Sequence, residues 1–336
     1  MEVRPFPSEP KLTSVTYDES RTYPYRLKGR VRLLFFWVDR DDVGGGEIVV
    51  SEKLKENGGM SRYIEVIFGS KPERVPGGIN RWGYGTEGSE WGKEELDGSR
   101  RLEETLFKGF MKHSPEKDLS EVVKNEGEVQ SGQLHWYKGT RSLVRSDQAV
   151  AKIRKFAAKE DFDYRRAHSI RCGYEKRVLK GADEKKELIN SGKDSYLQPY
   201  GFLTGVYSVI QEIVAEVSET GSLNRKTEPL VYVYNAKLYE LAIRGKKLLK
   251  KLEIPGPRGM PNEVYHSVAR VNFRLRKKSI RRTRDFTLWF PIKGKLRGVP
   301  IRIVDRPRWW LNIELNYDSS AEWEHLDSFD CKDIGG

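Results

Sequence analysis

The chain has 336 residues, of which 37% are hydrophobic, 33% are charged and 11% are aromatic, and its formal net charge is +12. This aromatic content excludes an intrinsically disordered chain, and the absence of an apolar run of about 18 residues argues against a membrane-spanning helix. The two cysteines, Cys172 and Cys331, exclude a disulfide framework, although a single bridge stays open.

The first predicted strand begins near residue 26, after an extended, proline-containing arm at 1–22. Apolar and basic residues alternate along it, which is typical of a half-buried strand. The predicted apolar face consists of Leu27, Val31, Leu33, Phe35 and Trp37, and the predicted basic face of Arg26, Lys28, Arg30 and Arg32. Further strands are predicted at 47–51, 62–68, 79–85 and 102–111.

The middle of the chain predicts helices. Ser114-Pro115-Glu116 has the composition of a helix start, so a short helix is expected up to Gly127. The stretch 132–181 stays open between elements, with two strands and a helix near 147–158 expected, and a helical turn within a polar linker is expected at 180–194. The clearest helix covers 200–217, where apolar residues recur every three or four positions and Gly221 follows as a stop signal.

Short strands separated by turns follow this helix. The stretch 229–245 predicts two strands around a tight connection at Asn235-Ala236, and alternating patterns predict further strands near 269–276, 285–290, 299–304 and 308–315. This order predicts a mainly β (α+β) protein with an antiparallel meander. The expected regions are an arm at 1–22, a β-rich region at 23–195, a helix plus meander at 196–318 and an acidic tail at 319–336. One continuous sheet domain over 23–318 stays open.

The stretch "WVDRDDVGGGEIVV" (37–50) is the one most suggestive of chemistry. Asp39 and Asp41 have the oxygen ligands that calcium or magnesium prefers. However, an EF-hand counted from Asp39 would place Val43 and Val50 at ligand positions, and the glycines lack the Lys-Ser/Thr of a phosphate-binding loop. An Asp-x-Asp metal site of the glycosyltransferase kind does not fit the antiparallel pattern. A turn is therefore favoured, with Arg40 and Arg81 as candidates to neutralise the acids.

No other motif predicts catalysis. The five histidines lack metal-ligand spacing, and no nucleophile-elbow motif is present. The sequence therefore predicts no catalytic residue, no metal and no cofactor. The expectation leans away from an enzyme, and a metal-dependent hydrolase or transferase using Asp41 or Asp42 is the enzymatic alternative.

The positive charge is concentrated in one segment. Residues 244–308 contain 20 lysines and arginines against 4 acids, whereas residues 318–336 contain six acids and one lysine. Such segregation suggests an anionic partner, although a solvated basic surface is the plain alternative. Adjacent tryptophans in a strand point to opposite faces, so one reading places Trp309 or Trp310 at the surface or in a groove. The other reading packs one of them in the core and sets the other over a sheet edge. The candidate ligand-binding residues are Arg270, Arg274, Arg276, Arg302, Arg306, Arg308, Trp309 and Trp310.

Four stretches carry a family resemblance: "YPYRLKGRVRLLFFWVDRDDVGGGEIVV", "GINRWGYG", "YVYNAKLYEL" and "VPIRIVDRPRWWLNIEL". With these, the chain resembles a family of uncharacterised bacterial proteins over most of residues 20–317. It is more weakly similar to a domain-of-unknown-function family of cell-envelope proteins. The resemblance implies a half-barrel sheet wrapped around one amphipathic helix and a role at the envelope, and it implies no catalytic residues. Ala236 departs from the hairpin glycine of that family.

The sequence thus predicts a non-enzymatic β-rich module that binds an anionic or amphipathic ligand, a lipid or a polyanion, in an apolar concavity with a basic rim. Nucleic acid is the alternative partner, although no helix-turn-helix, finger or RNA-recognition motif is present. The N-terminus lacks an apolar signal region. The expected location is therefore the cytoplasm, or the periplasm or envelope if a leader has been removed.

Overall fold

The computed structural model describes residues 19–33, 36–70, 74, 82–94, 100–113, 127–138, 141–152, 185–188, 199–234, 237–256, 260–277, 283–308 and 311–320. The described strands form one 15-stranded sheet in the order β8-β7-β6-β5-β4-β3-β2-β1-β15-β14-β13-β12-β11-β10-β9. Neighbouring strands are antiparallel except β9 and β10, which are parallel. The strands are β1 (Glu19–Leu33), β2 (Phe36–Leu54), β3 (Met60–Ser70), β4 (Trp82–Glu94), β5 (Arg100–His113), β6 (Gly127–Lys138), β7 (Arg141–Lys152), β8 (Lys185–Leu188), β9 (Pro199–Tyr200), β10 (Leu230–Tyr234), β11 (Lys237–Ile254), β12 (Glu263–Lys277), β13 (Thr283–Pro291), β14 (Arg302–Arg308) and β15 (Leu311–Tyr317).

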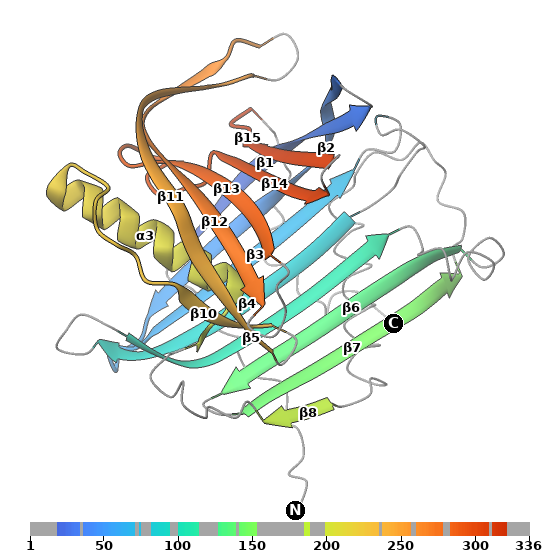
Figure 1. The fold of residues 1–336 in the computed structure, drawn as a ribbon. Coiled ribbons are helices and arrows are strands. Elements are labelled where there is room, and N and C mark those ends of the chain that lie inside the picture. Colours follow the sequence, from blue (N-terminus) through green and yellow to red (C-terminus); the bar gives the residue numbers. More distant parts are fainter. Residues whose placement is uncertain are drawn as a thin grey trace, which may run out of the picture.

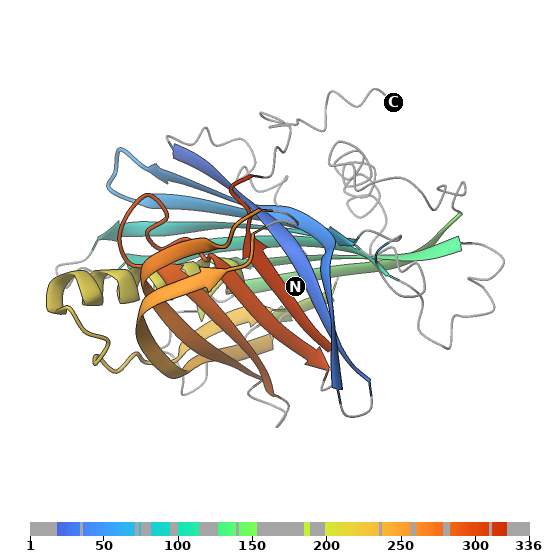
Figure 2. The same ribbon diagram turned by 90° about the horizontal axis from the view of Figure 1, so that it is seen from above.

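The sheet curls around helix α3 (Phe202–Thr220). The helix contacts β3 and β4 on one side and β10 on the other, and β9 comes close to β5. Figures 1 and 2 show the strands of the N-terminal half as one broad twisted layer and β10–β13 turning over it, with α3 between them. The predicted antiparallel, half-barrel-like sheet around one amphipathic helix is therefore confirmed.

The apolar stripe of α3 forms the main core. Val209, Ile210, Ile213 and Val214 are each at most 2% exposed, and they pack against the inner faces of β10–β13. The sheet contributes residues that alternate along each strand, among them Tyr232, Leu241, Val271, Phe273, Leu288 and Phe290. The helix therefore occupies the apolar side of the C-terminal strands, and the expected apolar concavity with a basic rim is wrong for this part of the sheet.

A carboxylate on the facing strand β4 caps the start of α3. Gly201 precedes the helix and has no side chain to cap it. The Glu87 carboxylate accepts hydrogen bonds from the Leu203 amide (3.0 Å), the Thr204 amide (2.8 Å) and the Thr204 hydroxyl (2.6 Å). Burial raises the pKa of Glu87, while these hydrogen bonds oppose the rise. A Cβ at position 201 would lie 2.1 Å from Glu87 Oε1, so glycine permits this close approach.

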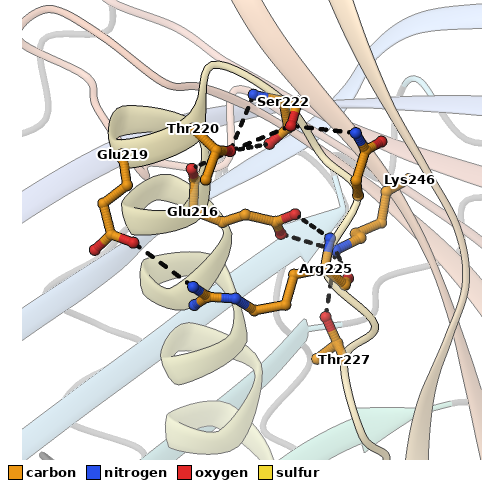
Figure 3. A network of polar contacts seen from close by, with 8 residues as sticks. Glu216, Glu219, Thr220, Ser222, Arg225, Thr227 and Lys246 are labelled. Atoms are coloured by element: carbon orange, nitrogen blue, oxygen red, sulfur yellow. Dashed lines mark hydrogen bonds and ion pairs between the residues drawn. The ribbon is translucent and has the colours of Figure 1, made fainter.

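A second buried glutamate ties the end of α3 to the sheet (Figure 3). Glu216, 3% exposed, accepts hydrogen bonds from the Arg225 amide (2.5 Å) and Lys246 Nζ (2.9 Å). Burial alone would raise the pKa of Glu216, but these hydrogen bonds outweigh it and hold the pKa below its ordinary value. The helix then ends at Gly221, which has a φ of 70° and donates its amide to Val217 O, as the sequence predicts.

Several sequence-based assignments are wrong. The predicted strand through Trp37 is a hairpin, because Leu33 pairs with Phe36 and Arg32 with Trp37. Trp37 therefore lies on β2 and does not continue β1. The predicted helix at 147–158 overlaps strand β7, and the predicted helical turn at 180–194 overlaps strand β8. The expected helix at 114–127 falls on residues 114–126, which lie outside the described residues, and β6 begins at Gly127.

The "DDVGGG" stretch is not a turn between strands. It lies inside β2, where the pairing with β1 shifts register between Leu27 and Gly29, opposite residues 40–44. Such a bulge lets a strand change direction without ending. The left-handed residue is Asp42, with a φ of 56°, whereas glycines 44–46 are buried and continue the pairing with β3.

Candidate anion-binding surface

One row of side chains crosses six strands on the outer face of the sheet, the face turned away from α3. Directly paired residues in an antiparallel sheet project from the same face. The row comprises Lys247 on β11, Arg270 on β12, Trp289 on β13, Arg302 on β14, Asn316 on β15 and Arg26 on β1. We call this set the cationic row. It holds four cations and no acid, and at about 4.8 Å between strands it extends over roughly 24 Å.

Trp289 organises the middle of the cationic row. The guanidinium carbons of Arg270 and Arg302 lie 5.4 and 5.1 Å from the centroid of its ring. Both distances fall within the range of cation–π attraction. The attraction to the ring offsets part of the repulsion between two arginines that flank the same side chain. Trp289 also packs against the smaller apolar cluster around Ile254, Val268 and Ile301, which fixes its position.

A bulge in β11 decides which lysine joins the row. The pairing with β12 shifts register between Ile243 and Gly245. Ile243 pairs with Phe273 and Lys246 with Val271, two fully buried residues of the core face. Lys246 therefore points inward to Glu216. Lys247 is left on the outer face opposite Arg270, whereas uninterrupted alternation from Ile243 would have placed it inside.

Acids near the row neutralise some of its members. Arg302 Nη2 lies 2.7 Å from Glu314 Oε2, and Arg26 Nε lies 3.0 Å from Asp318 Oδ2. Arg26 also donates to the carbonyls of Pro255 and Gly256, at the tip of the β11–β12 hairpin. Lys247 and Arg270 are exposed, and within the described part of the chain no ion pair is recorded for either. These two cations remain available to an external anion.

The structure brings together only some of the residues expected to bind the ligand. Arg270 and Arg302 share Trp289, and Arg274 lies on the same face as Arg270 but forms a two-point ion pair with Asp285. The hydrogen bond from Arg274 lowers the pKa of Asp285. Arg276 and Arg306 are exposed. The side chain of Arg308 and the whole of Trp309 and Trp310 lie outside the described residues, so their roles stay predictions.

Sequence reasoning missed Trp289, Lys247, Asn316 and Arg26 as members of the surface. Trp289 alternates with the buried Leu288 and Phe290, which is the signal that it faces outward. Its partners on the other strands depend on register and on the β11 bulge, and neither can be read from the alternation of single strands.

The chain was compared with protein families, curated proteins and solved structures. No family model and no curated protein matches it. Among solved structures, it is similar to a β-barrel-like protein of the domain of unknown function DUF1849 from Brucella abortus, with 9% sequence identity and a TM-score of 0.37. The match covers 88% of this chain and 94% of that chain. That protein's description names no ligand and no reaction.

The aspartates of the "DRDD" stretch are paired with cations. Lys28 Nζ lies 3.6 Å from Asp39 and 3.0 Å from Asp41, Arg30 Nε lies 2.6 Å from Asp39, and Arg74 lies 3.4 Å from Asp42. Of the expected partners, Arg40 is not among these three cations, and Arg81 lies outside the described residues. No group of three His, Cys, Asp or Glu side chains suited to a metal ion occurs among the described residues. In the same part of the chain, no helix is both long and apolar enough to span a membrane.

Proposed function

We propose that this β-rich protein is a non-enzymatic binding module whose outer sheet face holds an anionic partner against the cationic row. The observation that carries the proposal is the unbroken register from Lys247 to Arg26, which lines up four cations across six strands without an acid among them. Exposed ion pairs contribute only about 0–1 kcal/mol each. A partner that meets several cations at once gains from their sum, which favours an extended polyanion or an anionic surface over a small ion.

The arrangement of Arg270, Trp289 and Arg302 supports this proposal. Arginine recognises carboxylate, sulfate and phosphate groups through several N–H donors held in one plane. Stacking of both guanidinium groups on one ring holds these donors in place before the ligand arrives, which reduces the ordering cost of binding. The sheet beneath them is part of the packed core, so the surface is rigid.

The proposal is tested by titrating the protein with a short heparin fragment and with anionic or neutral lipid vesicles at low salt. A basic residue near an anionic surface contributes about 1 kcal/mol, so the double variant Lys247→Gln/Arg270→Gln is expected to bind the anionic probe roughly 30-fold more weakly. Lys226→Gln is the matched control, because Lys226 is a highly exposed cation on the loop after α3. This control is expected to keep the wild-type affinity.

The two probes distinguish a polymer from a membrane. Binding of heparin but not of anionic vesicles identifies a soluble polyanion, and the reverse identifies a lipid surface. Equal affinities for the wild type and the double variant, or equal losses in the double variant and the control, would show that the cationic row is only a solvated surface.

A further inference from the structure

The polar side chains on strand β15 are more deeply buried than its apolar ones. Asn312, Glu314 and Asn316 alternate along the outer face and are 5%, 3% and 5% exposed. The residues between them, which face the inside of the curl, are only partly buried. Short polar side chains on β15 thus lie between longer basic ones on both neighbouring strands: Arg26, Lys28 and Arg30 on β1 and Arg302 on β14.

Three polar atoms in this group have no hydrogen-bond partner among the residues that the structure describes. They are Asn312 Oδ1, Asn316 Oδ1 and Arg302 Nε, all of them buried. The nearby groups are already engaged, because Glu314 accepts from Arg302 Nη2 at 2.7 Å and from Asn316 Nδ2 at 3.0 Å. Buried polar groups are almost always satisfied, so three unsatisfied atoms on one patch call for partners, which either ordered water or the groups of a ligand supply.

We propose that the anionic partner of this surface is an acidic polysaccharide, a polymer that carries both carboxylate or sulfate groups and free hydroxyls. This inference rests on the proposed function and names its ligand class. The two amide oxygens need donors, and the Arg302 N–H needs an acceptor. Sugar hydroxyls donate to the asparagines, while the acidic groups accept from Arg302 and from the exposed Arg270 next in the row.

The spacing of the oxygens favours a polymer with repeated donors. Asn312 and Asn316 are four residues apart on an extended strand, roughly 13 Å. A linear polyphosphate offers anionic oxygens along its whole length but no hydroxyl donors, so it satisfies the cations and leaves both amide oxygens unpaired. Access to these oxygens requires the flanking Arg26, Lys28 and Arg30 side chains to rotate, and a ligand acid draws the same side chains toward itself.

The experiment measures the affinity of the full chain for oligogalacturonate and for linear polyphosphate of equal charge, at one salt concentration. The wild type is expected to prefer oligogalacturonate. Asn312→Leu removes an unsatisfied acceptor, so its melting temperature is expected to stay the same or rise. Its affinity for oligogalacturonate is expected to fall about tenfold, while its affinity for polyphosphate stays unchanged.

Two further variants complete the design. Asn272 lies on the same outer face, but its Oδ1 accepts a hydrogen bond from Thr287 Oγ1 at 3.0 Å, so Asn272→Leu is the control that should keep the preference for oligogalacturonate. Arg270→Gln should weaken the binding of both polymers equally. If the protein binds both polymers equally and Asn312→Leu changes neither affinity, ordered water satisfies the oxygens and the polysaccharide inference is overturned while the binding function stands. If neither polymer binds, the polysaccharide inference falls, and the vesicle titration decides whether the proposed function stands.

Discussion

Removal of the Glu87 carboxylate should destabilise the protein more than removal of any exposed acid on the same strand. Glu87 is 1% exposed and supplies the only side-chain acceptor recorded, within the described residues, for the amides of Leu203 and Thr204 at the start of α3. Glu87→Ala leaves these two N–H groups and the Thr204 hydroxyl beside an empty space, because Gly201 cannot replace the lost acceptor.

The expected loss of unfolding free energy follows from the number of hydrogen-bond donors that are left without an acceptor. Each buried, unsatisfied polar group costs about 1–3 kcal/mol. Two orphaned amides therefore predict a loss of about 2–6 kcal/mol for Glu87→Ala, against a total stability of roughly 5–15 kcal/mol for a typical domain. Glu87→Gln keeps one acceptor oxygen of the same reach. Because burial disfavours the charged form of Glu87 in any case, the amide variant should lose only about half as much.

Equilibrium urea unfolding followed by circular dichroism gives the free energies, and hydrogen exchange of the Leu203 and Thr204 amides localises the effect. Glu90→Ala is the matched control, since Glu90 lies on the opposite face of β4 and forms a partly exposed pair with Lys55. The control is expected to lose less than about 1 kcal/mol. Equal losses in the alanine variant of Glu87 and in the control would refute the assignment of Glu87 as the cap of α3.

Three other predictions concern the core, acid stability and the tail. Ile210→Asp places a carboxylate in a site that is 1% exposed, so it should unfold the protein, and a near-native thermal melt by circular dichroism would contradict the packing of α3. The pKa of Glu216 is lowered in the folded state, so its contribution to stability is complete above the unfolded-state pKa of about 4.3 and disappears as the pH falls through the folded-state value. Glu216→Gln should therefore show a flatter decline in unfolding free energy below about pH 5, and parallel declines in the two proteins would disprove this role. Truncation after Ser320 removes the acidic residues 321–336, which lie outside the described residues, but keeps Asp318 on Arg26; stronger heparin binding at low salt is expected, and identical affinities would mean that the tail does not compete for the cations.

The sequence alone was sufficient for the helix and for most of the strands. Apolar residues recur along α3 with a period that only a helix brings onto one face. Gly221 ends the helix as expected. The strands β10–β13 alternate clearly because α3 packs against one of their faces. The alternation of β1 also marks its basic outer face correctly up to Arg30. The chain then pairs back on itself from Phe36, although the sequence Leu34-Phe35 is not typical of a turn.

The residues of the candidate surface could not be predicted as a set, because the register between neighbouring strands decides which of them lie side by side. Arg270 and Arg302 were identifiable from their position in a basic segment. Their common neighbour Trp289 looked like one residue of an ordinary strand, and Lys247 reaches the outer face only through the bulge beside Gly245. Asn312, Glu314 and Asn316 alternate with apolar residues in a way that predicts ordinary solvent exposure. Their burial arises from the long side chains on both adjacent strands.

The salt dependence of binding tests the central claim most directly. The logarithm of the affinity for a charged polymer falls linearly with the logarithm of the salt concentration, and its slope grows with the number of ligand charges that the protein neutralises. The account predicts a slope for the wild type that becomes shallower by about one unit for each of Lys247→Gln and Arg270→Gln, with no change for Lys226→Gln. Identical slopes for all four proteins would contradict the claim that the cationic row binds an anionic partner.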